Sequence, residues 1–333
     1  MRKLGGMLSD NLLISKEKVE LSASVCKVDL ISDLVGEFPE LQGVMGGYFA
    51  AVQGFDKEVS LAISEQYLPV GFNSKIPKKP YSIALSLADK LDTLVGFFGI
   101  NYKPTSSKDP YALRRLALGI IRIIIENKKD FKIKDLISYS SSLYTDQGFE
   151  FQNKFLQKEL SDFLMERLKF FMKDQDIRYD IIQASTNSSN LDRSVVIYGK
   201  AKSLNKFINK PCGIDIISTY KRASNILDSE LKDQNIELSN TTDPGIFKTE
   251  YEKNLYKKIS DLRKYFSQIS NYQNFEQSLV NLAESKEVVF DFFDNVIVNE
   301  EDTILKKNRL ELIQMLCNTF DNYINFSLID PHQ

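Results

Sequence analysis

The chain has 333 residues, of which 43% are hydrophobic and 26% charged, and its formal net charge is -2. This composition is typical of a soluble protein with about two domains, and it excludes a chain that is basic overall, so any nucleic-acid surface must be a local patch. No stretch approaches the roughly 18 apolar residues of a membrane span and no signal-peptide core follows Met1, so we expect a soluble, cytoplasmic protein.

The first part of the chain reads as helices separated by short breaks. Apolar residues recur at helical spacing over residues 28–35, and Pro39 ends that helix because proline disfavours a helical residue before it. Residues 42–47 are mostly small, which allows two backbones to approach closely. Residues 56–67 are expected to form a helix, and the proline-rich residues 68–80 a loop.

Two strongly apolar helices follow. Residues 83–98 place apolar side chains at i, i+3, i+4 and i+7, which predicts a buried helix. Asp109 and Pro110 are expected to be the N-cap and first residue of the next helix, whose body at 113–125 is apolar on almost every face.

The sequence becomes more amphipathic beyond residue 130, and we place a domain boundary between residues 135 and 136. Further helices are expected at 155–171, 177–184, 214–227, 249–266, 275–298 and 303–326. No strand-like alternation of useful length occurs, so the predicted fold class is all-α.

Two carboxylates and two arginines stand on the apolar helices and could serve several purposes. Asp89 and Asp92 are three residues apart on one helix, and Arg114 and Arg115 open the next. The acids could be metal ligands, a general acid and base, or structural partners of the arginines. We favour structural ion pairs, because arginine and carboxylate groups suit a buried pair and His332 is the chain's one histidine.

The alternative is a metal-dependent phosphohydrolase of the HD type built on Asp29, Asp89 and Asp92, although such sites use several histidines. Residues 43–47 lack the lysine and hydroxyl of a phosphate-binding loop. The three cysteines at 26, 212 and 317 are too widely spaced for a zinc site and are expected to be buried free thiols. We therefore predict no catalytic residue and no metal ligand in this chain.

Two groups of polar residues are candidates for contact with nucleic acid. Both groups lie on predicted helices that also carry aromatics, Tyr220 and Tyr323, able to stack on unpaired bases. The candidate contacts are Lys221, Arg222, Lys307, Asn308 and Arg309.

Three ordered motifs, GEFPELQGVMG (36–46), ADKLDTLVG (88–96) and SKDPYALRR (107–115), make the chain similar to the beta subunit of bacterial glycyl-tRNA synthetase. The similarity continues at YKRASNIL (220–227), FFDNVIV (292–298) and NRL (308–310), so it covers almost the whole chain. The motifs become less specific towards the carboxyl end.

The resemblance implies an HD-like helical domain over residues 1–135 and, over 136–333, a helical anticodon-binding domain similar to that of arginyl-tRNA synthetase. Family members form a heterotetramer of two alpha and two beta subunits. In it, the alpha subunit holds ATP, Mg²⁺ and glycine and catalyses aminoacylation, while the beta subunit binds tRNA. The resemblance thus implies a tRNA-binding subunit without a cofactor of its own, whose partners are the alpha subunit and the tRNA for glycine.

The chain departs from the family pattern in two ways. Residues 52–55 are VQGF and residues 65–67 are EQY, where the family commonly has HDGE and EHY. In addition, residues 3–5 match a segment from the middle of a full-length beta subunit, so the resemblance is to the C-terminal half. A truncated, non-catalytic remnant is therefore a further alternative.

Overall fold

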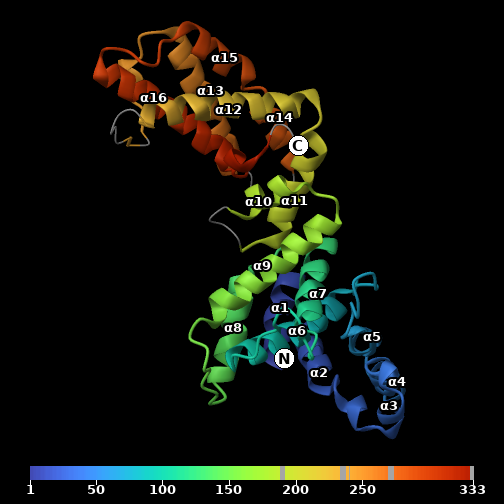
Figure 1. Ribbon diagram of the computed structural model, residues 1–333. Helices are drawn as coiled ribbons and strands as arrows, with labels where there is room; N and C mark the ends of the chain where they lie inside the picture. Colours follow the sequence, from blue (N-terminus) through green and yellow to red (C-terminus); the bar gives the residue numbers. More distant parts are fainter. Residues whose placement is uncertain (188–191, 233–237, 240, 269–273, 331–333) are drawn as a thin grey trace. The chain divides into compact units, whose positions relative to one another are not determined.

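The computed structural model describes residues 1–187, 192–232, 238–239, 241–268 and 274–330, and His332 lies outside these ranges. Within them every regular element is an α-helix or a 3-10 helix and no strand occurs, which confirms the predicted all-α class (Figure 1). No helix in the described ranges is long and apolar enough to cross a membrane.

The chain divides into two compact units. Unit 1 comprises residues 1–171 and 192–195, and unit 2 comprises residues 172–191 and 196–333. The predicted boundary at 135/136 falls inside unit 1, because helix α8 (Ile133–Thr145) packs against α6 (Pro80–Gly99) and α1 (Arg2–Leu12).

Unit 1 is built around α6, which contacts α1, α2, α5, α7 and α8 (Figure 1). Most of α6 is buried, as its apolar spacing predicts. The other elements of this unit are α2 (Lys16–Val25), η1 (Val28–Ile31), α3 (Asp33–Glu37), η2 (Pro39–Leu41), α4 (Val44–Val52), α5 (Lys57–Glu65), α7 (Leu113–Glu126) and most of α9 (Leu156–Asp174).

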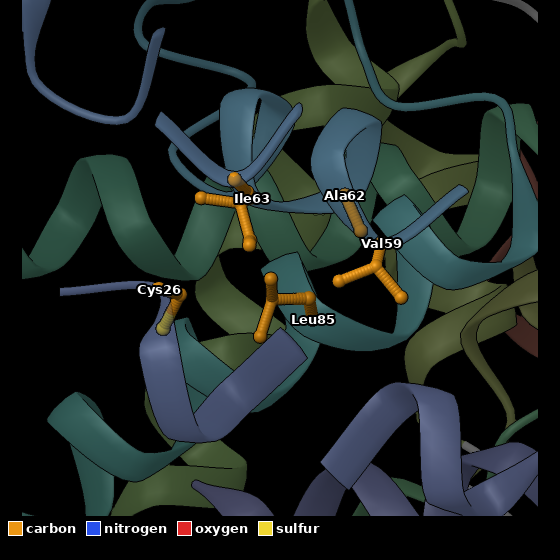
Figure 2. Packing of buried hydrophobic residues seen from close by; sticks show 6 residues of the cluster. Cys26, Val59, Ala62, Ile63 and Leu85 are labelled. Carbon is orange, nitrogen blue, oxygen red and sulfur yellow. The ribbon is translucent and has the colours of Figure 1, made fainter. Parts of the chain in front are cut away.

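The small-residue segment beside α5 permits the close approach that the sequence predicts. A Cβ atom added at Gly47 would lie 2.6 Å from Ser64 Cβ and 2.8 Å from the Ser60 carbonyl oxygen, so α4 and α5 meet almost backbone to backbone. The adjoining core brings together side chains from α4, α5, α6 and the end of α2 (Figure 2). This cluster contains Cys26, Ala50, Val59, Ala62, Ile63 and Leu85.

Several element boundaries differ from the sequence expectations. The helix expected over 28–35 is divided into η1 and α3, and the structure adds α1, α2, α4 and α8, which the sequence analysis does not predict. Helix α7 begins at Leu113 rather than Pro110, because Ala112 adopts a left-handed conformation with φ 54°. Asp109, four residues before the first residue of α7, nevertheless caps this helix, since its carboxylate accepts hydrogen bonds from the Leu113 and Arg114 amides.

Unit 2 packs α16 (Thr303–Asp321) against α12 (Pro211–Lys232) and α13 (Glu250–Gln268). The helix expected over 275–298 is two helices, α14 (Phe275–Ala283) and α15 (Lys286–Asn295). The remaining elements are α10 (Tyr179–Thr186), most of α11 (Ser194–Phe207), η3 (Pro244–Ile246) and η4 (Phe326–Leu328). All three cysteines are free thiols, but Cys212 is exposed, contrary to expectation.

Candidate nucleic-acid interface

Arg309 lies inside unit 2, contrary to its predicted place on a binding surface. Its side chain is 5% exposed, and Nε lies 2.8 Å from Glu252 Oε1. Nη1 donates to Glu300 Oε2 at 3.0 Å and to the Ile297 carbonyl oxygen at 2.6 Å. Nε and Nη1 are thus used within the protein, and because the side chain is buried, Arg309 is not exposed for contact with tRNA.

Glu252 is the central acceptor of this buried network and also caps α13. Its carboxylate accepts hydrogen bonds from the Lys248 and Thr249 amides and from the Thr249 hydroxyl, and it is fully buried. Burial by itself favours the neutral acid, but the hydrogen bonds from Arg309 and Thr249 outweigh it and lower the pKa of Glu252. The network therefore joins the start of α13 to α16 as an ionised pair.

Asn308 is also buried and acts within the protein. Its side-chain oxygen accepts from the Asp243 amide at 2.8 Å, and its side-chain nitrogen donates to the Asp243 carbonyl oxygen at 3.1 Å. The neighbouring Lys306 pairs with Glu230 at 2.9 Å. Because α16 is packed on nearly all sides, polar residues that look like a surface patch in the sequence form internal contacts instead.

Three of the predicted contact residues, Lys307, Lys221 and Arg222, face solvent at least in part. Lys307 is exposed and has no ion pair among the described residues. Lys221 is half-buried, and its ammonium donates to the Ser327 carbonyl oxygen at 3.3 Å. Tyr220 and Tyr323, expected to stack on bases, are buried in the core of unit 2, which removes them as base contacts.

Arg222 is held in a fixed position by aromatic rings. Its guanidinium carbon lies 4.7 Å from the centre of the Phe290 ring and 5.2 Å from that of Phe293. One nitrogen also pairs with Asp294 at 2.5 Å, where the carboxylate is largely exposed. Stacking of this kind holds the planar guanidinium in an orientation that suits an oxyanion such as phosphate.

A cleft that the sequence does not predict borders α16. Its volume is about 780 Å³, and Lys307 and Ile304 line it together with the segment around η3. The Thr242 hydroxyl in its wall is buried and has no hydrogen-bond partner among the residues that the structure describes. The cleft thus combines an exposed cation with hydroxyl and apolar groups and with the acidic residues Asp243 and Glu311.

The predicted pairing of Asp89 and Asp92 with Arg114 and Arg115 in unit 1 is wrong. Asp89 pairs with Lys27 at 2.6 Å. Asp92 Oδ1 lies 3.1 Å from the Met1 amino nitrogen, Arg114 donates to the Thr105 carbonyl oxygen, and Arg115 is exposed. The two acids interact with residues at the ends of α1 and α2, whereas the arginines, in the first turn of α7, make no ion pair with either acid.

Lys27 makes the ion pair that the sequence analysis assigned to an arginine. Its ammonium also donates to Tyr67 Oη at 3.0 Å and lies 4.1 Å from the centre of that ring. Burial opposes its charge, but Asp89 and the Tyr67 hydroxyl outweigh this effect and raise the pKa of Lys27. Lys27 precedes Asp89 by 62 positions in the sequence, so helical spacing could not reveal this ion pair.

Lys90 is a second cation that sequence reasoning missed. It is 1% exposed, and its ammonium donates to the Leu68 carbonyl oxygen and the Ser86 hydroxyl, both at 2.8 Å, and to the Gln66 carbonyl oxygen at 3.3 Å. Burial lowers the pKa of Lys90 to about 8. Its methylenes lie against Gly119 of α7, where a larger residue would collide with them.

The carboxylates proposed for a metal-dependent phosphohydrolase are engaged separately. Asp29 Oδ2 accepts hydrogen bonds from the Gly43 amide at 2.6 Å and the Gly46 amide at 3.2 Å, while Asp89 and Asp92 have the partners described above. Within the described ranges, no group of three or more His, Cys, Asp or Glu residues could hold a metal ion. No observation in the structure favours this alternative.

Comparisons with known proteins identify the same family as the three ordered sequence motifs. Residues 1–187 match the family model for the glycyl-tRNA synthetase beta subunit, and residues 216–331 match that for the DALR anticodon binding domain. The glycine--tRNA ligase beta subunit of Rickettsia prowazekii (strain Madrid E) is 38% identical over 94% of this chain and 45% of its own length. That of Rickettsia bellii (strain OSU 85-389) is 39% identical over 92% of this chain and 43% of its own length. The chain thus spans less than half the length of these relatives, and it belongs to the glycyl-tRNA synthetase beta subunit family.

Proposed function

We propose that this chain is the tRNA-binding C-terminal part of a glycine--tRNA ligase beta subunit and acts in the cytoplasm. In this proposal the alpha subunit binds ATP, Mg²⁺ and glycine and carries out catalysis, while the present chain holds the tRNA and binds no cofactor itself. The observation that carries the proposal is the match of residues 216–331, most of unit 2, to an anticodon-binding domain.

The solvent-facing cations of unit 2 support this assignment. Lys221 and Arg222 are on α12, and Lys307 is on α16 beside the cleft. Phosphate contacts provide much of the affinity for nucleic acid, and the stacked guanidinium of Arg222 suits such a contact. The chain as a whole carries a net charge of -2, so binding must depend on local groups of cations, and we assign it to these three.

The proposal is tested by measuring the binding of labelled glycine tRNA to the full chain by fluorescence anisotropy at several salt concentrations. The Lys221→Ala/Arg222→Ala variant should bind at least about tenfold more weakly. Its slope of log affinity against log salt should shrink by about one for each phosphate contact removed. Lys253→Ala is the matched control, because that exposed lysine on α13 pairs with Glu250.

Two outcomes would contradict the proposal. If the wild-type chain shows no salt-dependent affinity for this tRNA, the chain is a remnant without the tRNA-binding function. If the chain binds tRNA but the double variant and Lys253→Ala behave alike, the assignment of Lys221 and Arg222 is wrong.

A further inference from the structure

Helix α4 of unit 1 contains no charged residue, yet it has an open side. Gly46, Gly47 and Ala50 are buried, and α4 packs closely against α5. Three further residues of α4 lie four positions apart from one another. They are Val44, Tyr48 and Val52, whose side chains are 42%, 64% and 86% exposed. Spacing of four places these three side chains in one stripe along the helix. The helix therefore has an apolar stripe that no residue in the described ranges covers.

The segment beside α4 adds to this exposed apolar surface. Element η1 contacts both α4 and α3, and its Ile31 is 86% exposed. Leu34 and Phe38, in and after α3, are exposed as well. A single exposed apolar residue is ordinary, but a cluster on neighbouring elements marks an interaction site. We call the stripe Val44, Tyr48 and Val52, together with Ile31 and Leu34, the α4 face.

The charges in this part of the chain narrow the choice of partner. Residues 28–56 contain no lysine or arginine, while Asp33, Glu37 and Glu40 are exposed. These acids would repel the phosphates of a tRNA. A second copy of the same face would oppose acid to acid, so self-association through it is also disfavoured. An apolar surface flanked by basic residues on a different polypeptide fits both the stripe and its acidic surroundings.

We propose that the α4 face binds a different protein subunit through an apolar contact flanked by basic residues on the partner. This inference rests on the proposed function, which makes the alpha subunit of glycyl-tRNA synthetase that partner. Unit 1 then carries the protein contact, whereas the cations assigned to tRNA lie in unit 2.

The test is the binding of the purified full chain to the alpha subunit of the same organism, measured by isothermal titration calorimetry. Tyr48→Glu/Val52→Glu should weaken this binding at least about a hundredfold, because charges would replace two buried apolar contacts. The matched control is Ile100→Glu, at an exposed apolar position after α6 and outside this face. It should bind like the wild type. Circular dichroism should show the same helix content and melting temperature for all three proteins.

A second variant tests the charge argument. Asp33→Lys/Glu37→Lys should slow association with the alpha subunit at low salt by about tenfold, and added salt should reduce the difference. An unchanged association rate would overturn the proposed basic edge of the partner.

Other results would overturn the inference and identify what failed. If Tyr48→Glu/Val52→Glu binds the alpha subunit normally, the α4 face is not its docking site, and the proposed tRNA function is unaffected. If the wild type does not bind the alpha subunit while still binding glycine tRNA, the partner assignment fails but the tRNA assignment stands. Loss of tRNA affinity or of self-association in this variant would show a different occupant.

Discussion

Replacing Arg309 by methionine tests whether this residue supports the fold of unit 2 rather than binding tRNA. The change keeps an unbranched side chain but removes the guanidinium that pairs with Glu252 and Glu300. Glu252 would retain its capping hydrogen bonds from Lys248 and Thr249, but its charge would be buried without a counter-ion. Breaking a buried pair from one side costs about 3 to 5 kcal/mol.

The loss should appear in thermal denaturation followed by circular dichroism. A unit of this size loses roughly 2 to 4 °C of melting temperature per kcal/mol, so Arg309→Met should lower that of unit 2 by about 6 to 20 °C. Lys307→Met is the matched control, because Lys307 is exposed on the same helix, and it should change stability by less than about 0.5 kcal/mol. The structural assignment is refuted if Arg309→Met keeps wild-type stability but loses tRNA affinity.

The same pair predicts an acid dependence of stability. The pKa of Glu252 is lowered in the folded state, so its contribution is fully present above the ordinary glutamate pKa. The contribution is lost as the pH falls through the lower folded pKa, because the unfolded chain binds the proton first. The difference in unfolding free energy between wild type and Arg309→Met should therefore shrink as the pH is lowered into that range.

Three further changes test unit 1. Burial lowers the pKa of Lys90 to about 8 in the folded protein, so above that pH the unfolded chain binds more protons than the folded chain. The free energy of unfolding of the wild type should therefore rise relative to that of Lys90→Met between pH 8 and 10, as measured in guanidinium titrations. Gly47→Ala should cost about 1 to 3 kcal/mol by overpacking, whereas Gly36→Ala, with open space around it, should be neutral or slightly stabilising in thermal melts. Asp89→Ala should cost about 1 to 2 kcal/mol in denaturant titrations, since Lys27 stays partly solvated; a loss above 3 kcal/mol would contradict that.

Apolar periodicity predicts the helices whose buried faces are continuous and misses those with sparse signals. Helix α6 buries nearly every residue from Ser82 to Leu91, and its position follows from the spacing alone. Helix α2 was missed because it buries only Val19 and Ser22. Helix α1 carries buried Leu4 and Leu8 four residues apart, so its helical spacing is visible in the sequence.

The candidate site was harder to predict, because a charge on a helix does not reveal the side that packs. Lys306 and Arg309 are three residues apart and turn inward, while Lys307 between them faces solvent. Their acidic partners come from other elements, such as Glu252 at the start of α13, so helical spacing carries no information about them. Motif order succeeded where spacing failed, because it identifies the family without any knowledge of contacts.

The burial of Arg309 and Lys306 bears on how the two proposed interactions can be separated. Because these two cations are engaged inside unit 2, the proposed tRNA binding is assigned to Lys221, Arg222 and Lys307, while the acidic surroundings of the α4 face in unit 1 suit a protein. Sites with no shared partners contribute additively to free energy. A chain changed at both the α4 face and Lys221/Arg222 should therefore lose each affinity by the amount seen in the single variants. A departure by more than about 0.5 kcal/mol would show that the alpha subunit and tRNA bind to coupled surfaces.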